Sequence, residues 1–297
     1  MSAQSRDASH RGPATPVPER SLAPVLTPRK PALKLPSGTC DTHIHVFGDH
    51  TRYPLATERH YTPALCGLDD YRQTANVLGI ARAVLVQPSV YGRDNRALLG
   101  ALSMGGANFR GVVVIGADIQ EQTLDQLHDA GVRGVRANLV NSNGLSAADA
   151  LRLAPRLRER GWHLQLQVAI DTFAGLGDFV SQAGLPVVID HFGLPSTSDP
   201  DTRAFRGLLG LVGRGLCWVK MSAHYRLEDV EVKRLARALA RSNPARTLWA
   251  TDWPHPGLGG RPMPDDAASV DALADWLPDE DQRQQALVDN PSRLYWV

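Results

Sequence analysis

Short apolar runs alternate with longer amphipathic segments from Leu35 to the end of the chain. Eight of the short runs have the length and residue types of β-strands. Many of them are continuous apolar runs, as parallel strands covered on both faces should be. The eight runs are Thr39–Val46, Ala83–Gln87, Gly111–Ile115, Gly134–Asn138, His163–Val168, Pro186–His191, Cys217–Met221 and Thr247–Asp252.

Seven segments between these runs carry apolar residues near helical spacing. They are Leu68–Leu78, Asn95–Ser103, Glu121–Ala130, Ala147–Arg160, Asp171–Ala183, Arg203–Val212 and Glu228–Ser242. A glycine follows several of them, where a left-handed helix C-cap favours this residue. These glycines are Gly79, Gly131, Gly161, Gly184 and Gly215.

The alternation of strands and helices predicts an α/β fold, a single (β/α)8 TIM barrel, which typically needs ~250 residues. An open doubly wound sheet is the alternative. No Gly-x-Gly-x-x-Gly motif follows the first strand, so the dinucleotide-binding form of that sheet has no local support. We therefore expect residues 38–297 to form one barrel domain.

The first 37 residues differ in composition from the rest of the chain. Seven prolines interrupt a mixture of Ser, Arg and Ala, and no apolar core of a secretory signal is present. We expect residues 1–37 to form a disordered or loosely packed extension without chemistry.

Charge and cysteine content narrow the class of protein. The formal net charge is +1, so no basic surface indicates nucleic acid as a partner. No apolar stretch approaches the ~18 residues of a membrane span. The three cysteines are widely spaced and lack a CxxC motif, which is typical of a reducing compartment. We expect a cytoplasmic protein that acts on a small molecule, as a monomer or a small homo-oligomer.

Ionisable residues stand where several predicted strands end, which is the face where barrel enzymes place their active sites. His43 and His45 lie two residues apart on a strand, so both point to one side. His191 ends the sixth strand and Asp252 the eighth. We expect these four side chains to meet around a single gap the size of a water molecule.

Further polar residues follow other strand ends. Arg136 ends an apolar strand, where a guanidinium needs an anion such as a substrate carboxylate. Ser89, Tyr91, Gln167 and Arg226 are the remaining candidates for substrate binding.

Each assignment has a structural alternative. Asp252 is also a residue type that caps helix N-termini, and a lone histidine such as His191 is often a core residue bonded to a carbonyl. Arg136 can simply neutralise a neighbouring acid. Arg226 can be a solvated surface arginine. Tyr91 can pack with its hydroxyl satisfied nearby.

Motifs along most of the chain resemble those of the amidohydrolase superfamily, in the branch that contains 2-pyrone-4,6-dicarboxylate lactonase and the sugar lactonases. The resemblance covers about residues 37 to 297. Its main motifs are Asp41-Thr42-His43-Ile44-His45, Ile189-Asp190-His191-Phe192-Gly193 and Thr251-Asp252-Trp253-Pro254-His255, with Val86-Gln87-Pro88-Ser89-Val90-Tyr91-Gly92, Arg133-Gly134-Val135-Arg136 and Asn290-Pro291-Ser292-Arg293-Leu294-Tyr295 as further matches.

This resemblance implies hydrolysis of a small ester or lactone, carboxylated or derived from a sugar, at the mouth of the barrel. It implies that Asp252 acts as general base on water and that the three histidines polarise the carbonyl. It also implies that Arg136 and Arg226 hold substrate carboxylates. The family pattern has a second arginine where this chain has Ser142, so the clamp for a dicarboxylate is weaker here.

Whether a metal takes part stays open at this stage. His43, His45 and Asp252 can supply the three ligands of a catalytic zinc. Most mononuclear members also use a histidine on the fifth strand, where this chain has Gln165 and Gln167. The resemblance to the lactonase implies hydrolysis without metal, which favours a metal-free or weakly metal-binding site.

Other activities compatible with the same site are lactone isomerisation and metal-dependent decarboxylation or hydration. A ligand-binding barrel without catalysis is the alternative outside the enzymes. It is disfavoured because the four central residues His43, His45, His191 and Asp252 are all present.

Overall fold

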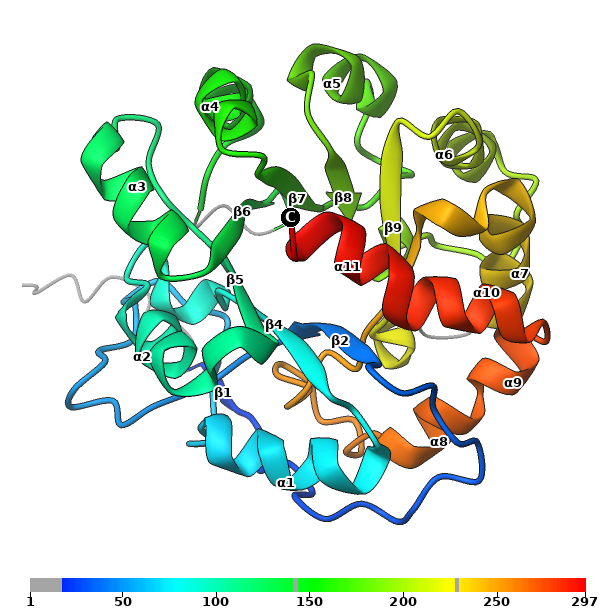
Figure 1. Cartoon of the computed structure of the whole chain (residues 1–297), viewed down its shortest axis with the longest axis horizontal. Helices are drawn as coiled ribbons and strands as arrows, with labels where there is room; N and C mark the ends of the chain where they lie inside the picture. The colour runs from blue at the N-terminus through cyan, green and yellow to red at the C-terminus, as the bar shows by residue number, and fades with distance from the viewer. Residues whose placement is uncertain (1–17, 141–143, 228–229) are drawn as a thin grey trace, which may run out of the picture.

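The computed structural model describes residues 18–140, 144–227 and 230–297. Eight parallel strands form one sheet in the order β10-β9-β8-β7-β6-β5-β4-β2, which confirms the predicted barrel (Figure 1). The strands are β2 (Cys40–Ile44), β4 (Arg82–Val86), β5 (Phe109–Val113), β6 (Val132–Asn138), β7 (His163–Gln167), β8 (Val187–Ile189), β9 (Cys217–Met221) and β10 (Thr247–Trp249).

The residues that follow β10 bring the two ends of this sheet together. The N–H of Asp252 donates to the carbonyl of His43 at 3.1 Å, and the N–H of His45 donates to the carbonyl of Trp253 at 2.8 Å. Ile44 and Trp253 form a parallel bridge. The seam of the barrel therefore lies where the first histidine pair meets the last aspartate.

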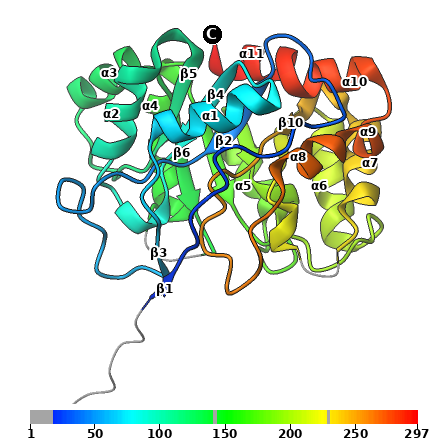
Figure 2. The ribbon, with the colours of Figure 1, turned by 90° about the horizontal axis from the view of Figure 1, so that it is seen from below.

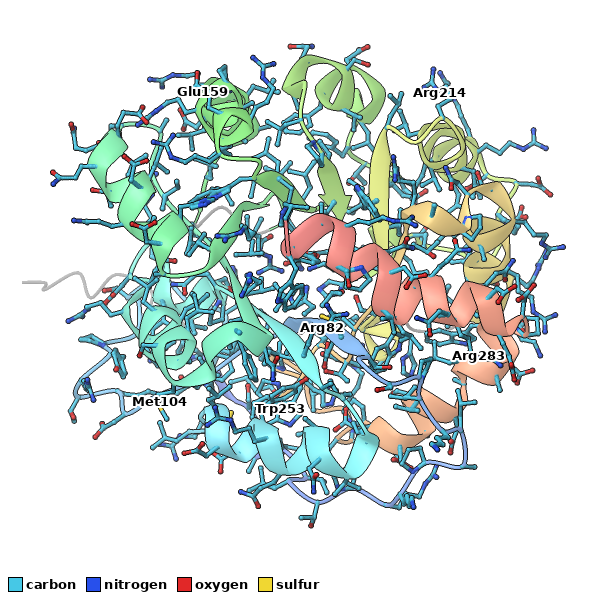
Figure 3. All side chains as sticks on the ribbon, viewed as in Figure 1. Arg82, Met104, Glu159, Arg214, Trp253 and Arg283 are labelled. Carbon is cyan, nitrogen blue, oxygen red and sulfur yellow. The ribbon has the colours of Figure 1, made fainter. Side chains whose placement is uncertain are left out.

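Helices cover the outside of the barrel between successive strands. They are α1 (Leu68–Leu78), α2 (Arg96–Gly105), α3 (Glu121–Asp129), α4 (Ala147–Glu159), α5 (Leu176–Ala183), α6 (Arg203–Gly213) and α7 (Val232–Ser242). The glycines expected to end helices have positive φ angles, between 61° and 93°. In Figure 3, long charged side chains such as Glu159 and Arg214 extend outward from this layer.

Two helices begin several residues later than the sequence predicts: α7 begins at Val232, where we expected a helix over Glu228–Ser242, and α5 differs by more. We expected a helix over Asp171–Ala183, but α5 begins at Leu176. The carboxylate of Asp171 accepts a hydrogen bond from the Ser196 N–H, and Gly175 adopts a left-handed conformation with φ of 86°. These two features hold residues 171–175 in turns in place of a first helical turn.

After β10 the chain forms a series of short helices. They are α8 (Asp266–Asp271), α9 (Leu273–Trp276), α10 (Glu280–Gln284) and α11 (Asn290–Tyr295). Figure 1 shows α11 lying across one end of the barrel, and Figure 2 shows that β1 (Glu19–Arg20) and β3 (Tyr61–Thr62) lie at the opposite end.

The interior of the barrel changes character along its axis. Its floor is apolar and includes Val84, Val188 and Leu248, with Leu294 and Tyr295 of α11 packed against them. Above this floor the buried side chains become polar and charged. The site described below lies at the C-terminal ends of the strands, above this apolar layer.

The N-terminal residues that the structure describes contact the barrel. β1 pairs with β3, and the N–H groups of Gly257 and Gly260 donate to the side chains of Ser21 and Glu19. The Arg29 guanidinium bonds Asp265 and Asp271 further along this segment. Residues 1–17, the other part of the expected extension, lie outside the described residues.

Among the described helices, none has both the length and the apolar character needed to cross a lipid bilayer.

Candidate active site

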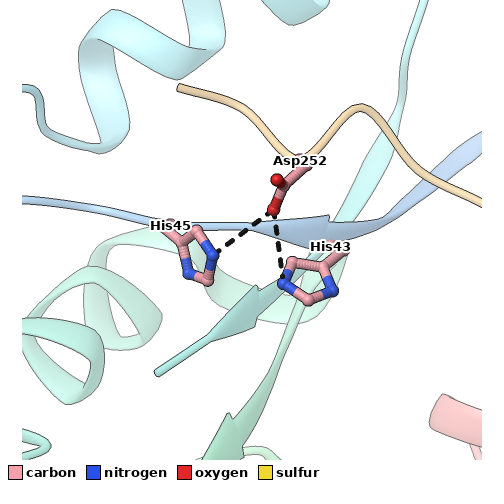
Figure 4. A group of neighbouring side chains, drawn as sticks. All are labelled: His43, His45 and Asp252. Carbon is pink, nitrogen blue, oxygen red and sulfur yellow. Dashed lines mark ion pairs between the residues drawn. The ribbon is translucent and has the colours of Figure 1, made fainter. Parts of the chain in front are cut away.

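Four side chains predicted from the sequence meet at the C-terminal end of the barrel. Asp252 Oδ1 lies 3.5 Å from His45 Nε2, 3.6 Å from His43 Nε2 and 4.0 Å from His191 Nε2. In Figure 4, His43, which lies on β2, and His45, which follows this strand, both point toward the Asp252 carboxylate. All four residues are at most 3% exposed, so their contacts are shielded from bulk solvent.

The backbone around these residues explains how they converge. His43 and His45 point to one side of the chain at the end of β2, with ring centroids 4.9 Å apart. His191 and Asp252 both have positive φ angles, 53° and 65°. Such conformations cost energy in residues other than glycine, and they cluster at functional sites.

Asp252 does not cap a helix, which removes its structural alternative. The next described helix is α8, and its N-cap is Asp265, whose side chain accepts from two backbone N–H groups. The Asp252 carboxylate instead points at the imidazoles.

The partners of the Nδ1 atoms define which ring nitrogen carries the proton. His45 Nδ1 lies 2.7 Å from the carbonyl of Val86, and His43 Nδ1 lies 3.2 Å from Asp190 Oδ1. Carbonyl and carboxylate oxygens only accept, so both histidines carry a proton at Nδ1, and in the neutral ring this leaves a bare Nε2. His191 Nδ1 lies 2.8 Å from the Ser222 hydroxyl, which can donate or accept.

The two oxygens of Asp252 have different environments. Oδ2 accepts from the Tyr225 hydroxyl at 2.5 Å and from Arg226 Nε at 3.1 Å. Burial would raise the pKa of Asp252, but the Arg226 guanidinium holds it well below its usual range. The group is therefore an anchored carboxylate whose Oδ1 faces the histidines.

Two of the nearby histidines, His43 and His191, are neutral at pH 7. Burial lowers the pKa of His43 well below its usual value, although Asp190 opposes this effect. Burial also lowers the pKa of His191 to about 4. The central group therefore combines one negative carboxylate with at least two uncharged imidazoles, those of His43 and His191.

The same atoms can hold a divalent metal ion. His43 Nε2, His45 Nε2 and Asp252 Oδ1 lie within 4.8 Å of one another. In the described part of the chain, His43 Nε2 and Asp252 Oδ1 are buried without a hydrogen-bond partner. Two bare imidazole nitrogens and a carboxylate, with the Nδ1 protons held by second-layer acceptors, are a donor set that fits zinc.

Arg136 and Gln167 lie side by side next to this group. Arg136 donates from Nε to Asp190 Oδ2 at 3.2 Å and from a terminal nitrogen to Gln167 Oε1 at 2.6 Å. Arg136 thus has a neighbouring acid, Asp190, as the alternative role of neutralising an acid requires. The other terminal nitrogen of Arg136 donates to the carbonyl of Gln87 at 3.4 Å, and two of the five guanidinium N–H groups stay outside these three contacts.

Arg226 is only partly exposed and touches the general-base candidate directly. Besides its bond to Asp252, it donates from a terminal nitrogen to the carbonyl of Pro256 at 2.7 Å. Burial alone would lower the pKa of Arg226, but Tyr225 and Asp252 raise it. It is a fixed cation at the site and not a solvated surface residue.

Ser89 and Tyr91 have different surroundings. Ser89 lies close to the hydroxyl of Tyr61, whose charged neighbours include Arg226, Asp252 and Arg136. The Tyr91 hydroxyl accepts from the N–H of Gly48 at 3.1 Å, and its ring lies beside Phe47. The structure thus brings Ser89 to the site, whereas Tyr91 supports the loop after β2.

Several residues at the site were not among the predicted site residues. Tyr61 stands on the two-residue strand β3, far from any motif, so the sequence carried no signal for it. Asp190 and Lys220 did carry one, because each is a charged residue in or next to a continuously apolar run. Lys220 is fully buried, and burial lowers its pKa to about 8 against the opposing effect of Asp190.

Comparison with known proteins adds an independent line of evidence. The profile of the family described as Amidohydrolase matches residues 40–296. The 2-pyrone-4,6-dicarboxylate hydrolase of Comamonas testosteroni is 37% identical over 91% of this chain and 93% of that protein. The 4-sulfomuconolactone hydrolase of Hydrogenophaga intermedia is 35% identical over 88% of this chain and 89% of its own.

A solved structure has a similar fold. The apo crystal structure of an Agrobacterium tumefaciens protein is similar with a TM-score of 0.80 and 29% identity, over 90% of this chain and 98% of that chain.

Proposed function

This chain belongs to the amidohydrolase family and is a hydrolase of that type, and from this premise we propose that it opens the lactone ring of a small anionic substrate. One observation carries the proposal: Asp252 is an ionised, buried carboxylate with one oxygen anchored and the other facing three imidazoles. The relatives that hydrolyse a pyrone dicarboxylate and a sulfomuconolactone support a lactone as substrate.

The proposed reaction adds one water molecule across the ring C–O bond. Asp252 Oδ1 takes a proton from water as the water oxygen attacks the lactone carbonyl. The tetrahedral intermediate collapses, the ring oxygen leaves, and it receives the proton that Asp252 holds. The product is a hydroxy acid or its keto form, and Asp252 returns to its carboxylate state. Proton transfer by such a positioned group contributes roughly 10²–10⁴-fold to the rate.

The tautomers refine the role expected for the histidines. An oxyanion needs donors, and donors aimed at it supply a large part of the catalytic effect. His43 and His45 present bare Nε2 atoms, so in this state they accept from water and cannot donate to the oxyanion. Among the three imidazoles, this leaves His191, whose Nε2 carries a proton when Ser222 donates to its Nδ1.

A metal ion fits the same atoms. Held by His43, His45 and Asp252, a zinc ion would supply Lewis acidity at the carbonyl and acidify water. The protein residues then keep the tasks of orienting the substrate and excluding solvent. Zinc content of protein purified without added metal, together with activity before and after chelation, tests this part. Stoichiometric zinc and loss of activity on chelation support it, and full activity of metal-free protein contradicts it.

Substrate charge is the next part of the proposal. Two cations lie at the site: Arg226 contacts the catalytic carboxylate of Asp252, and Arg136 contacts Asp190. A guanidinium binds carboxylates through paired N–H groups. Ser142, where the family pattern has another arginine, lies outside the described residues. We therefore propose acidic lactones as substrates without choosing a dicarboxylate. Pyrone and muconolactone carboxylates should outperform neutral sugar lactones in kcat/KM.

Replacement of Asp252 tests the assigned base. Asp252→Asn keeps the shape of the side chain but removes the proton acceptor, so kcat should fall by about 10²–10⁴-fold. Substrate binding, measured by calorimetry, and the melting temperature should change little. The exposed Asp178→Asn is the matched control and should keep wild-type kinetics. Near-normal kcat in Asp252→Asn would show that another group is the base.

A further inference from the structure

Asp190 is a buried carboxylate at the end of β8 that contacts both halves of the site. It is fully buried. Its Oδ1 lies 3.2 Å from His43 Nδ1, and its Oδ2 accepts from Arg136 Nε at 3.2 Å. Gln165 Nε2 donates to Oδ2 at 3.1 Å, and Lys220 Nζ lies 3.6 Å from Oδ1.

We propose that Asp190 is a positioning residue that holds His43 in its Nδ1–H tautomer and orients the terminal N–H groups of Arg136. One carboxylate would then set both the water-activating and the anion-binding half of the site. The inference rests on the proposed function of this site, but its first test needs no turnover.

The tautomer of His43 decides whether Asp252 is free to act. With an acceptor at Nδ1, the proton stays there and Nε2 is bare. Without that acceptor, the proton can move to Nε2, which lies 3.6 Å from Asp252 Oδ1. A small shift would then make Nε2–H a donor to Oδ1 and occupy the oxygen that must take the proton from water. The same change would remove a lone pair from the metal-binding set.

The orientation of Arg136 depends on the other oxygen of Asp190. Its Nε bond to Oδ2 and its terminal bonds to Gln167 and to the Gln87 carbonyl fix the plane of the guanidinium, and the last of these is the longest, at 3.4 Å. A flat guanidinium binds a carboxylate well only when two of its N–H groups are aligned with both oxygens. Loss of Asp190 would free this plane and weaken binding of acidic substrates.

The surroundings of Asp190 keep it an acceptor. Burial would raise its pKa, but His43, Lys220 and Arg136 hold it well below the usual range. Lys220 in turn donates to the Thr42 carbonyl at 2.8 Å and to Gln165 Oε1 at 2.7 Å. Because these donors surround it, Asp190 stays ionised and accepts hydrogen bonds.

The wild-type protein gives the first test. Long-range nitrogen–proton NMR on chelator-treated full-length protein assigns the tautomer of each histidine. We expect His43 to be protonated at Nδ1 and bare at Nε2. An Nε2–H tautomer of His43 in the folded wild-type protein overturns the proposal, whatever the catalytic activity is.

Asp190→Asn gives the second test. Arg136 and Gln165 both donate to one side of this residue, so they claim the amide oxygen and turn the amide NH2 toward His43 Nδ1. His43 should then become the Nε2–H tautomer, and both zinc affinity and kcat should fall by about 10–100-fold. The KM of an acidic lactone should rise more than that of a neutral one.

Arg136→Gln separates the two roles. This variant should raise the KM of acidic lactones but keep the His43 tautomer and the zinc affinity of wild type. The exposed Asp201→Asn controls for loss of a carboxylate elsewhere. A folded Asp190→Asn with the wild-type tautomer and zinc affinity contradicts the proposal. If no lactone is turned over but the tautomer changes as expected, the proposed function fails and the role of Asp190 stands.

Discussion

The two carboxylate oxygens of Asp252 have different roles. Oδ2 is fixed by the Tyr225 hydroxyl and the Arg226 guanidinium, and Oδ1 faces the imidazoles. A carboxylate in water rotates and is solvated on both oxygens. Here the direction of the basic lone pairs is set before substrate arrives, which is the kind of preorganisation that catalysis needs.

Tyr225→Phe tests this division at the residue scale. The variant removes the 2.5 Å hydrogen bond but leaves Arg226 in place. A hydrogen bond to a charged group contributes about 1.5–3 kcal/mol, so kcat should fall about 10- to 100-fold.

The pH profile of Tyr225→Phe should shift in one direction. The donor stabilises the ionised form of Asp252, so its loss raises the pKa of that group. The acidic limb of kcat/KM should therefore move to higher pH. Tyr295→Phe, a change to a buried tyrosine at the other end of the barrel, is the matched control and should leave the profile unchanged. An unshifted limb in Tyr225→Phe would contradict the anchoring role.

Sequence reasoning reached some of these residues and missed others for a physical reason. His43, His45, His191 and Asp252 were found because strand ends of a barrel converge on one face, whatever the side-chain details are. The second layer, Asp190 with His43 and Tyr225 with Asp252, depends on which way individual side chains turn. That information lies in the packing and not in the order of residues.

At the scale of elements, the seam between β2 and the residues after β10 holds the site together. Asp41 lies in β2 and accepts from the Thr251 N–H at 3.0 Å and from its hydroxyl at 2.5 Å. The His43 N–H and the Tyr71 hydroxyl donate to the same carboxylate at 3.2 Å and 3.3 Å. The carboxylate thus binds both sides of the seam between His43 and Asp252.

Asp41→Asn tests the seam. An amide accepts through one atom only, so at least one of these buried donors loses its partner. The free energy of unfolding should fall by about 1–3 kcal/mol, measured by urea denaturation. Activity should fall as well, because the seam sets the separation of His43 and Asp252. Thr251→Val removes a single hydroxyl and serves as the milder comparison. Unchanged stability in Asp41→Asn would show that the seam is held by the backbone alone.

Elements were predictable where periodicity dominates. The range of α1 and that of β9 agree with the expectation because apolar spacing and bounding glycines coincide there. The predicted start of α5 at Asp171 was wrong because the Asp171 carboxylate accepts a hydrogen bond from Ser196, a residue of the next loop. Strand β3, which carries Tyr61, has two residues and pairs with the N-terminal segment. No local pattern marks such a strand.

At the scale of the whole molecule, the barrel buries ionisable side chains well away from the catalytic carboxylate. His163 lies on β7 with its ring 5.1 Å from that of Tyr295, and a side chain at Gly134 would overlap it. Burial lowers the pKa of His163 to about 3, with a smaller contribution from Lys220. The folded protein therefore keeps this ring neutral in mild acid.

This burial predicts how stability depends on pH. Below about pH 6.5 the unfolded chain protonates His163 but the folded chain does not. The resulting loss of stability grows as pH falls from about 6.5 toward 3 and is absent above that window. His163→Phe should flatten the decline of the unfolding free energy between pH 7 and pH 5. The exposed His60→Phe should keep the wild-type slope, and an equally steep slope in both variants would contradict the assignment.

The central claim is that this barrel adds water to a lactone, and product mass tests it most directly. A pyrone or muconolactone carboxylate is incubated with the enzyme in water labelled with oxygen-18, and the product is analysed by mass spectrometry. We predict a product heavier than the substrate by one labelled water, with the label in the new carboxylate, and formation of this product about 10²–10⁴-fold more slowly by Asp252→Asn. A product with the mass of the substrate, or one that has lost carbon dioxide, would contradict hydrolysis.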